Sequence, residues 1–304
     1  SKNFVKLAVI SFILSNLFWG GASPIYKWSF SDIHPFTLAF LRFFIPSVLI
    51  GIFGFKNLKI QLKHVPLLLA VSLCDITFNV GLFFIALQYT QSINGPIIGS
   101  AGPVFLILAS MLMLKERPTR KMLFGNLIGL TGVLLIVVQP VLTQSSGENY
   151  SSVIGNLLLI AATIAFALGT VFAKELRPYY SGISITFWSF ALGSLTFLPL
   201  FLNEVYKYGF LPNLSDKGVY GLLYATVVSS TIAYFLYYWA IKYIHASETG
   251  IFSYTDPVVA VLIAGPLLNE HPTLIFFLGA LMVFAGIYVA EGRLNYHPLH
   301  KLIR

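Results

Sequence analysis

The segment TRKMLFGNLIGLTGVLLIVV (119–138) indicates what kind of fold this chain adopts. Its two basic residues stand at the beginning, and Asn126 and Thr131 are the only polar side chains in the rest. A helix needs about 20 such residues to cross the roughly 30 Å hydrocarbon core of a bilayer. The segment therefore predicts a transmembrane helix.

Nine other segments share this length and apolar character. Together with 119–138 the predicted spans are 5–28, 36–54, 65–88, 94–114, 152–173, 182–203, 217–241, 247–268 and 272–291. The segments are continuously apolar, whereas the strands of a membrane β-barrel alternate apolar and polar residues. We therefore expect an all-α membrane protein of ten transmembrane helices, joined by loops too short for a soluble domain.

The composition agrees with this expectation. Of the 304 residues, 57% are hydrophobic and 10% are charged, and the mean hydropathy is +0.82. Soluble domains carry roughly 25% charged residues. The composition excludes a soluble enzyme, a disordered chain and a disulfide-rich secreted scaffold. The single cysteine, Cys74, has no partner for an internal disulfide.

The basic residues gather on one side of the predicted membrane. When successive loops alternate between the two sides, 15 of the 19 Lys and Arg residues fall on one side, in the two tails and the inner loops. Only Lys27, Lys207 and Lys217 fall on the other. The positive-inside rule then places both termini in the cytoplasm. The net charge of +8 marks the inner membrane face rather than a nucleic-acid surface, and 5–28 is expected to be an integral helix rather than a signal peptide.

The sequence also repeats itself. An offset of 154 residues places KERPT (115–119) on NEHPT (269–273). The same offset aligns Pro103 with Pro257, Glu116 with Glu270, Gly125 with Gly279, and Gly132 with Gly286. Earlier in each half the offset is 147, which aligns Lys27 with Lys174. The pattern predicts two repeats of five helices each, at residues 1–143 and 144–304. Because five is odd, the two repeats have opposite orientations, as in many secondary transporters.

Several motifs resemble the ten-helix, EamA-type branch of the drug/metabolite transporter superfamily. They are FWGGASPIYK (18–27), FLRFF (40–44), LKERPTRKMLFGNLIGLTGVLLIV (114–137), SSTIAYFLYYWAIKYIHASETGIFSYTDPVVAVL (229–262) and LNEHPTLIFFLGALMVFAGIYV (268–289). The resemblance covers both halves. It implies an exporter of amino acids or similar metabolites, although other members move nucleotide sugars, choline or other small molecules.

Three charged residues inside the predicted spans are candidates for the transport site. Asp75 and Asp256 lie about nine or ten residues into their helices, which is roughly 14 Å deep. Arg42 lies near the outer end of its span. Ionisable groups at such depth usually face a cavity or a partner. We expect the acids to bind a cationic group of the substrate or a coupling proton; the alternative is that these residues are structural.

Polar and aromatic residues in the spans complete the candidate site. These are Trp19, Asn79, Tyr234, Tyr238 and Tyr254. A phenol or an amide in lipid needs a partner, so several of them are expected to face an amphipathic cavity. In contrast, Tyr26, Trp28 and Tyr243 are expected in the interfacial belts.

Prolines predict breaks in two symmetry-related helices. Pro103, preceded by Gly102, and Pro257, preceded by Asp256, lie within the spans 94–114 and 247–268. Each removes a backbone donor, so we expect a broken helix that lines a cavity; the alternative is a simple kink. The remaining charges of the repeat motifs, Lys27, Lys174, Glu116 and Glu270, lie at helix ends and are interpreted as turn and interface anchors.

The sequence therefore predicts a secondary or facilitative carrier in the plasma (bacterial inner) membrane. No metal-ligand, catalytic or ATP-binding motif is present, so no enzyme activity and no cofactor are expected. The expected partners are a small-molecule substrate, the lipid bilayer and a coupling proton, with monomer and homodimer both open. The alternatives are an importer of a cationic or nucleotide-type metabolite, or a channel.

Overall fold

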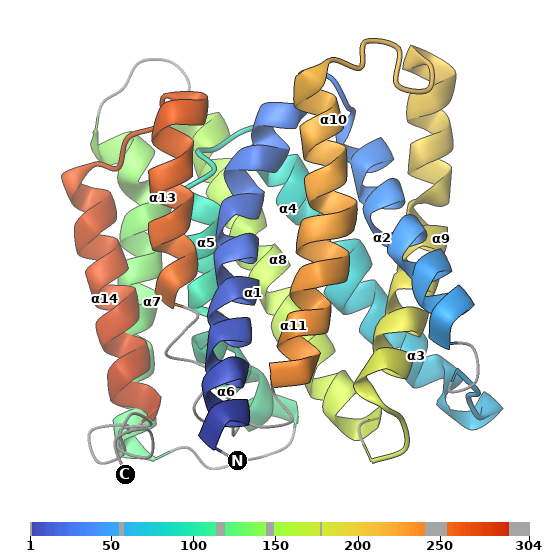
Figure 1. Ribbon diagram of the computed structural model, residues 1–304. Helices are drawn as coiled ribbons and strands as arrows, with labels where there is room; N and C mark the ends of the chain where they lie inside the picture. The colour runs from blue at the N-terminus through green and yellow to red at the C-terminus, as the bar shows by residue number, and fades with distance from the viewer. Residues whose placement is uncertain are drawn as a thin grey trace.

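The computed structural model describes residues 2–54, 58–113, 119–143, 149–176, 178–240 and 254–291, and all of its regular structure is helical (Figure 1). In chain order the helices are α1 (Lys2–Ser29), α2 (Pro35–Gly54), η2 (Leu62–His64), α3 (Val65–Ser72), η3 (Leu73–Phe78), α4 (Asn79–Leu87), α5 (Asn94–Ser100), α6 (Gly102–Met113), α7 (Arg120–Leu142), α8 (Asn149–Leu176), α9 (Gly182–Tyr208), α10 (Asp216–Leu223), η4 (Tyr224–Ile232), α11 (Ala233–Ala240), α13 (Thr255–Leu268) and α14 (Leu274–Glu291).

The helices carry their apolar side chains on the outside of the bundle as well as inside. Phe53, Leu112 and Leu262 are 85%, 83% and 69% exposed. A soluble protein does not leave such residues in water, so this surface faces lipid. Seven of the described segments are long and apolar enough to cross a membrane, and α13 and α14 are shorter apolar helices. The described part of the chain is therefore that of an all-helical integral membrane protein.

The predicted span 94–114 is divided into α5 and α6. The break falls at Ala101, whose ψ of 3° ends α5, and Gly102 and Pro103 begin α6. Pro103 has no amide hydrogen with which to continue the ladder of α5. The predicted span 247–268 is described from Tyr254 onward, and residues 247–253 lie outside the described ranges.

Two helices contain π-helical segments at equivalent positions of the repeat. η3 covers Leu73–Phe78 and η4 covers Tyr224–Ile232, so the 154-residue offset places η3 within η4. π-helical turns are rare and occur frequently at functional sites. The same offset aligns Asp75 with Ser229, and the carbonyl oxygen of each accepts a side-chain N–H group. The donor is Asn79 for Asp75 and Trp19 for Ser229.

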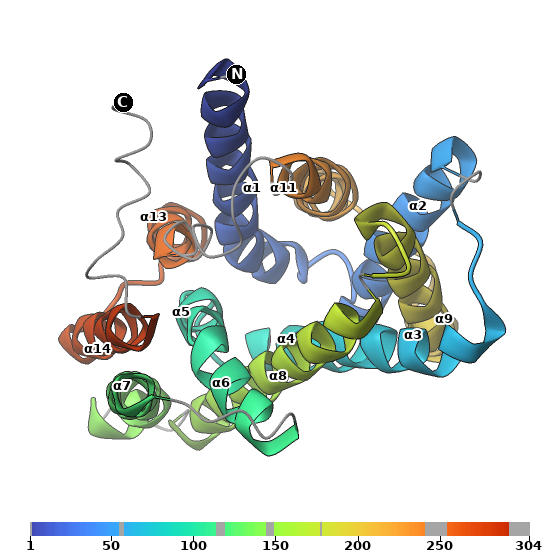
Figure 2. The same ribbon diagram turned by 90° about the horizontal axis from the view of Figure 1, so that it is seen from below.

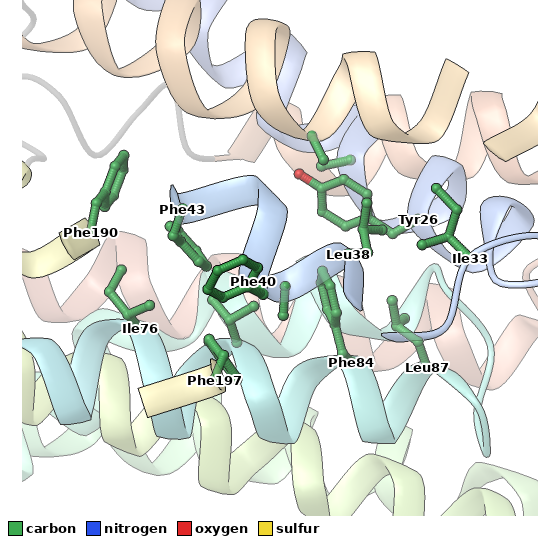
Figure 3. Packing of buried hydrophobic residues seen from close by; sticks show 14 residues of the cluster. Tyr26, Ile33, Leu38, Phe40, Phe43, Ile76, Phe84, Leu87, Phe190 and Phe197 are labelled. Atoms are coloured by element: carbon green, nitrogen blue, oxygen red, sulfur yellow. The ribbon is translucent and has the colours of Figure 1, made fainter. Parts of the chain in front are cut away.

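The helices pack in pairs that join the two halves of the chain. Figure 2 shows α7 beside α14 at one side of the bundle, and α2 and α9 together at the other. One apolar core lies between α1, α2, α4 and α9, where Tyr26, Phe43, Phe84, Phe190 and Phe197 are buried (Figure 3). This core surrounds the polar residues described below.

Glycines bring the backbones of α7 and α14 into direct contact. A Cβ at Gly125 would lie 2.5 Å from the carbonyl oxygen of Gly286, and one at Gly132 would lie 2.6 Å from that of Gly279. The contact is antiparallel, because the earlier glycine of α7 faces the later glycine of α14. It is also reciprocal: Gly125 faces Gly286, the repeat equivalent of Gly132, and Gly132 faces Gly279, the repeat equivalent of Gly125. Small residues permit this close approach in lipid.

Asp32, between α1 and α2, caps the first turn of α10. Its Oδ2 accepts hydrogen bonds from the amides of Ser215 (3.0 Å) and Gly218 (2.9 Å), and from the Ser215 hydroxyl. The hydroxyl, followed by the amides, lowers the pKa of Asp32 to about 2. Because the folded pKa is depressed, this contribution to stability is present near neutral pH. It is lost as the pH falls from about 4 towards 2.

Candidate functional site

Trp19 links α1 to the second half of the chain. Its indole Nε1 donates a hydrogen bond of 2.9 Å to the carbonyl oxygen of Ser229 in η4. The indole ring also packs edge-on against Tyr234 in α11, with 5.1 Å between ring centroids. Two of the predicted site residues are therefore in contact, and the contact crosses between the two sequence repeats.

Gly20 and Gly21, the next two residues of α1, allow two segments of the second half to approach closely. A Cβ at Gly20 would lie 2.8 Å from the backbone oxygen of Asp256 in α13, and one at Gly21 would lie 2.8 Å from the Tyr224 hydroxyl. That hydroxyl donates a hydrogen bond to the carbonyl oxygen of Phe18. The glycine pair thus places Asp256 and Tyr224 against α1, at the two residues that follow Trp19 in the sequence.

Tyr26 is buried inside the bundle, not placed in an interfacial belt. It is 1% exposed, and its hydroxyl shares a short hydrogen bond with the Ser229 hydroxyl. The prediction of a belt position was wrong. A tyrosine can be fully buried when its hydroxyl finds a partner, and helix α1 carries Tyr26 inward against η4.

Arg42 in α2 reaches the same cluster. Its Nε donates a hydrogen bond of 3.2 Å to the Ser230 hydroxyl, and its guanidinium carbon lies 5.0 Å from the ring centroids of both Tyr26 and Phe43. We call the group of Trp19, Tyr26, Arg42, Ser229, Ser230 and Tyr234 the central polar cluster. Its residues come from α1, α2, η4 and α11.

Asp75 lies against a different helix. A Cβ at Gly169 of α8 would collide with the Asp75 carboxylate, so the absence of a side chain there makes room for the acid. Asp75 Oδ1 is buried and accepts no hydrogen bond within the described ranges. Asn79 donates to the backbone of Asp75 at 3.1 Å, which accounts for one of its two amide hydrogens. Between described residues, the hydrogen bonds of Asp75 and Asn79 do not lead to the central polar cluster.

Asp256 and Pro257 lie in the first turn of α13. A proline in the first turn costs no helical hydrogen bond, so Pro257 starts the described helix and does not interrupt it. Asp256 Oδ1 is buried without a hydrogen bond among the described residues. Tyr254, the residue that caps α13, packs on Phe284 of α14 with 5.0 Å between ring centroids, in a separate apolar cluster.

The remaining candidates are less informative. Gly102 and Pro103 start α6, and a Cβ at Gly102 would have ordinary clearance from Thr163 of α8 at 4.0 Å. The side chain of Tyr238 lies outside the described residues, as do Glu116 and the side chain of Lys174.

Sequence reasoning missed the serines and two of the tyrosines of this region. Ser229 and Ser230 are ordinary residues in an apolar span, and Tyr26 and Tyr224 gave no separate signal. The sequence repeat could have pointed to Ser229, because the 154-residue offset aligns it with the predicted site residue Asp75. That alignment could have identified η4 as the counterpart of η3.

A second polar cluster forms at the end of α1. Lys27 Nζ contacts Glu270 Oε1 at 2.8 Å and donates to the Thr90 carbonyl oxygen at 2.6 Å. Glu270 Oε2 accepts from both the amide and the hydroxyl of Ser92, each at 2.7 Å. These bonds connect α1, the loop between α4 and α5, and the turn between α13 and α14. They fit the predicted anchor role of Lys27 and Glu270.

Comparisons with known proteins agree with this architecture. The model of the EamA-like transporter family matches residues 6–138 and again residues 153–291. The chain is 31% identical to the uncharacterized transporter YetK of Bacillus subtilis over 288 residues, which cover 93% of this chain and 86% of YetK. It is also 28% identical over 292 residues to an uncharacterized transporter of Archaeoglobus fulgidus, covering 95% and 98% of the two chains.

A solved structure supports the fold alone. A protein crystal structure with 16% sequence identity superposes with a TM-score of 0.64, covering 93% of this chain and 97% of the other. The family model, in contrast, matches most of the sequence of both halves. The chain belongs to the EamA-like transporter family.

Proposed function

We propose that this protein is a secondary carrier that moves small organic metabolites across the cell membrane by alternating access, most simply as an exporter of amino acids or similar amphiphiles. The central polar cluster is the observation that carries the proposal. Its hydrogen bonds run from α1 and α2 to η4, inside helices that cross the membrane. Polar groups at that depth mark substrate pathways.

The proposed architecture is ten transmembrane helices in two inverted repeats, residues 1–143 and 144–304, with both termini cytoplasmic. Three observations support it. The family model matches the chain twice, η3 and η4 coincide under the repeat offset, and α7 contacts α14 through reciprocal glycines. A two-fold relation between the halves produces such reciprocal contacts. α1 also begins, and α14 ends, at the same end of the bundle (Figure 1).

Flux measurements in proteoliposomes test the carrier proposal. The vesicles are preloaded with unlabelled amino acid, and labelled amino acid is added outside. We expect the label to accumulate transiently inside the vesicles, because a carrier exchanges its substrate. A channel gives no such counterflow. Flux that rises linearly with concentration and shows no counterflow would contradict the proposal.

Cysteine labelling tests the topology. Single cysteines are placed at 56–63 and at 144–150 in a Cys74→Ser background, and a membrane-impermeant maleimide is added to intact cells. We expect the reagent to label 144–150 and to leave 56–63 unlabelled, because the basic loop at 56–63 is predicted to be cytoplasmic. Reaction of the 56–63 positions in intact cells, at the rate seen after permeabilisation, would overturn this orientation.

Isosteric substitutions test the two acids. We propose that Asp75 carries the coupling proton, because its buried oxygen lies against α8 apart from the central polar cluster. We propose that Asp256 binds a substrate ammonium group. Asp75→Asn is then expected to abolish pH-driven uptake and to spare counterflow. Asp256→Asn is expected to weaken substrate binding roughly 10- to 150-fold, the effect of losing one charge-assisted hydrogen bond.

Melting temperature provides the control for both variants. If either acid is only structural, its asparagine variant melts lower while flux per folded molecule stays at the wild-type value. Full pH-driven flux and unchanged affinity in both well-folded variants would remove Asp75 and Asp256 from the transport site.

A further inference from the structure

We propose that Arg42 is the anion-binding subsite of the carrier, and that the transported molecule bears a carboxylate attached to an apolar body. This inference rests on the proposed carrier function and deepens it by naming the charge that the substrate must carry.

Arg42 is a cation without a counter-ion among the described residues. The one ion pair in those ranges joins Lys27 to Glu270. Arg42 donates to Ser230 through Nε, and none of its other N–H groups has a hydrogen-bonding partner in the described part of the chain. A guanidinium group carries five N–H donors. The outer edge of the guanidinium group, which presents two parallel N–H groups, can therefore donate to a bound anion.

The depth of Arg42 in α2 makes its lack of a counter-ion among the described residues significant. Arg42 is seven residues after Pro35, which places its Cα roughly 10 Å along the helix from its first residue. An unpaired charge at that depth is costly, and such residues normally pair with one another or with a ligand. No carboxylate in the described ranges pairs with Arg42, and a carboxylate on the substrate is the partner that this proposal assigns to it.

The side chain points into the protein and not toward the lipid headgroups. Its guanidinium lies over the rings of Tyr26 and Phe43, each of which is 1% exposed. The two ring contacts and the bond to Ser230 fix the plane of the fork. A fixed fork matches the two oxygens of a carboxylate, and a lysine ammonium group does not reproduce this geometry.

Aromatic rings continue from Arg42; they are buried at Phe43 and Phe190 and partly exposed at Tyr234 and Trp19. Phe43 packs edge-on against Phe190, Phe190 against Tyr234, and Tyr234 against Trp19, each pair with centroids 5.1 Å apart. Trp19 returns to Ser229, the neighbour of Ser230. The circuit combines one cation, two serines and a row of rings. It suits a carboxylate with an aliphatic or aromatic body, and it disfavours a purely cationic substrate.

A matched ligand series tests the subsite on the wild-type protein. L-Phenylalanine, 3-phenylpropanoate and L-phenylalaninamide share a ring; the second lacks the amine and the third lacks the carboxylate. We expect L-phenylalanine to raise the melting temperature of the purified protein and to inhibit counterflow. The amide keeps the ammonium group and the ring, so its roughly 10- to 150-fold weaker action measures the carboxylate contact alone. 3-Phenylpropanoate, which lacks the ammonium group assigned to Asp256, measures the other contact. Equal action of L-phenylalanine and its amide, or no response to L-phenylalanine, overturns the proposal.

Substitution of Arg42 then tests whether this residue causes the preference for the carboxylate over the amide. Arg42→Gln is expected to weaken carboxylate binding roughly 10- to 150-fold and to bring the ratio of acid to amide affinity close to one. Arg42→Lys keeps the charge and is expected to recover part of the affinity. Arg120→Gln is the matched control, since Arg120 is exposed at the start of α7, and it should leave the ratio unchanged.

The outcomes separate this inference from the carrier proposal. Counterflow that accepts amides as well as acids retains the carrier and removes the anion subsite. A second outcome is that carboxylates stabilise the protein, that Arg42→Gln loses this stabilisation, and that no counterflow is seen. This outcome supports the anion subsite and contradicts the carrier proposal. If Arg42→Gln does not fold, Arg42→Lys and the wild-type ligand series still decide, because a structural or lipid-bound arginine gives no preference for the acid.

Discussion

Gly286→Ala is expected to lower the melting temperature of the purified protein by on the order of 6–12 °C. The added methyl group would lie 2.5 Å from the carbonyl oxygen of Gly125 in α7, and a backbone atom cannot rotate away. Overpacking costs about 1–3 kcal/mol in cores where side chains adjust, and this contact lies at the upper end or above. A loss of about 3 kcal/mol corresponds to the stated shift at roughly 2–4 °C per kcal/mol.

Gly99→Ala provides the matched control. It makes the same chemical change inside a helix, α5, but a Cβ at Gly99 meets nothing within 4 Å. We expect this variant to melt no lower than the wild type and up to about 4 °C higher, because alanine favours the helix by up to about 1 kcal/mol and meets no obstacle. Unfolding is followed by tryptophan fluorescence at one scan rate. Equal melting temperatures for Gly286→Ala and Gly99→Ala would show that α7 and α14 do not pack as described.

Glu270→Ala is expected to destabilise the protein by about 3–5 kcal/mol, as does the loss of one partner from a buried ion pair. Glu270 is 7% exposed, and its carboxylate accepts from Lys27 and twice from Ser92. Its removal leaves the ammonium of Lys27 without a counter-ion and the Ser92 amide without an acceptor. The Lys27 side chain is 27% exposed, so water recovers part of the loss and the lower end of the range is expected.

A double-mutant cycle isolates the Lys27–Glu270 interaction. The variants are Lys27→Met, Glu270→Gln and both together, and the free energy of unfolding or the melting temperature is measured for each. Glutamine keeps the shape of the acid, so the cycle reports the charge. We expect the double variant to be more stable than the sum of the single losses predicts, because it leaves no unpaired charge. Additive losses would show that Lys27 and Glu270 do not interact in the membrane-embedded protein.

The sequence and the structure agree closely on which segments are helical and apolar. The predicted span 119–138 begins one residue before α7 and otherwise lies within it, 152–173 lies within α8, and 182–203 lies within α9. These boundaries were accessible because the bilayer sets both the length and the composition of a helix that crosses it. The break at Ala101 was also signalled, since Gly102 and Pro103 follow it directly.

The composition of the candidate site was less accessible to sequence reasoning. Trp19, Arg42 and Tyr234 were found because large or charged side chains are conspicuous in an apolar span. Ser229 and Ser230 were not, because a serine in a membrane helix normally bonds to its own helix. Tyr26 was assigned to the interface, since nothing in a linear pattern shows that α1 turns this ring towards η4, where it meets Ser229.

The amino-acid sequence by itself determined the class of protein, the apolar helices of the described ranges and the family. All three depend on properties that act locally or recur along the chain: apolar length, charge placement and motif spacing. Only the tertiary structure decided which polar groups meet, because helix–helix contacts in lipid depend on close backbone approach at glycines and on side-chain rotation about each helix. Thus Gly20 and Gly21 bring α13 and η4 against α1, and Arg42 bonds to Ser230 and to no acid among the described residues.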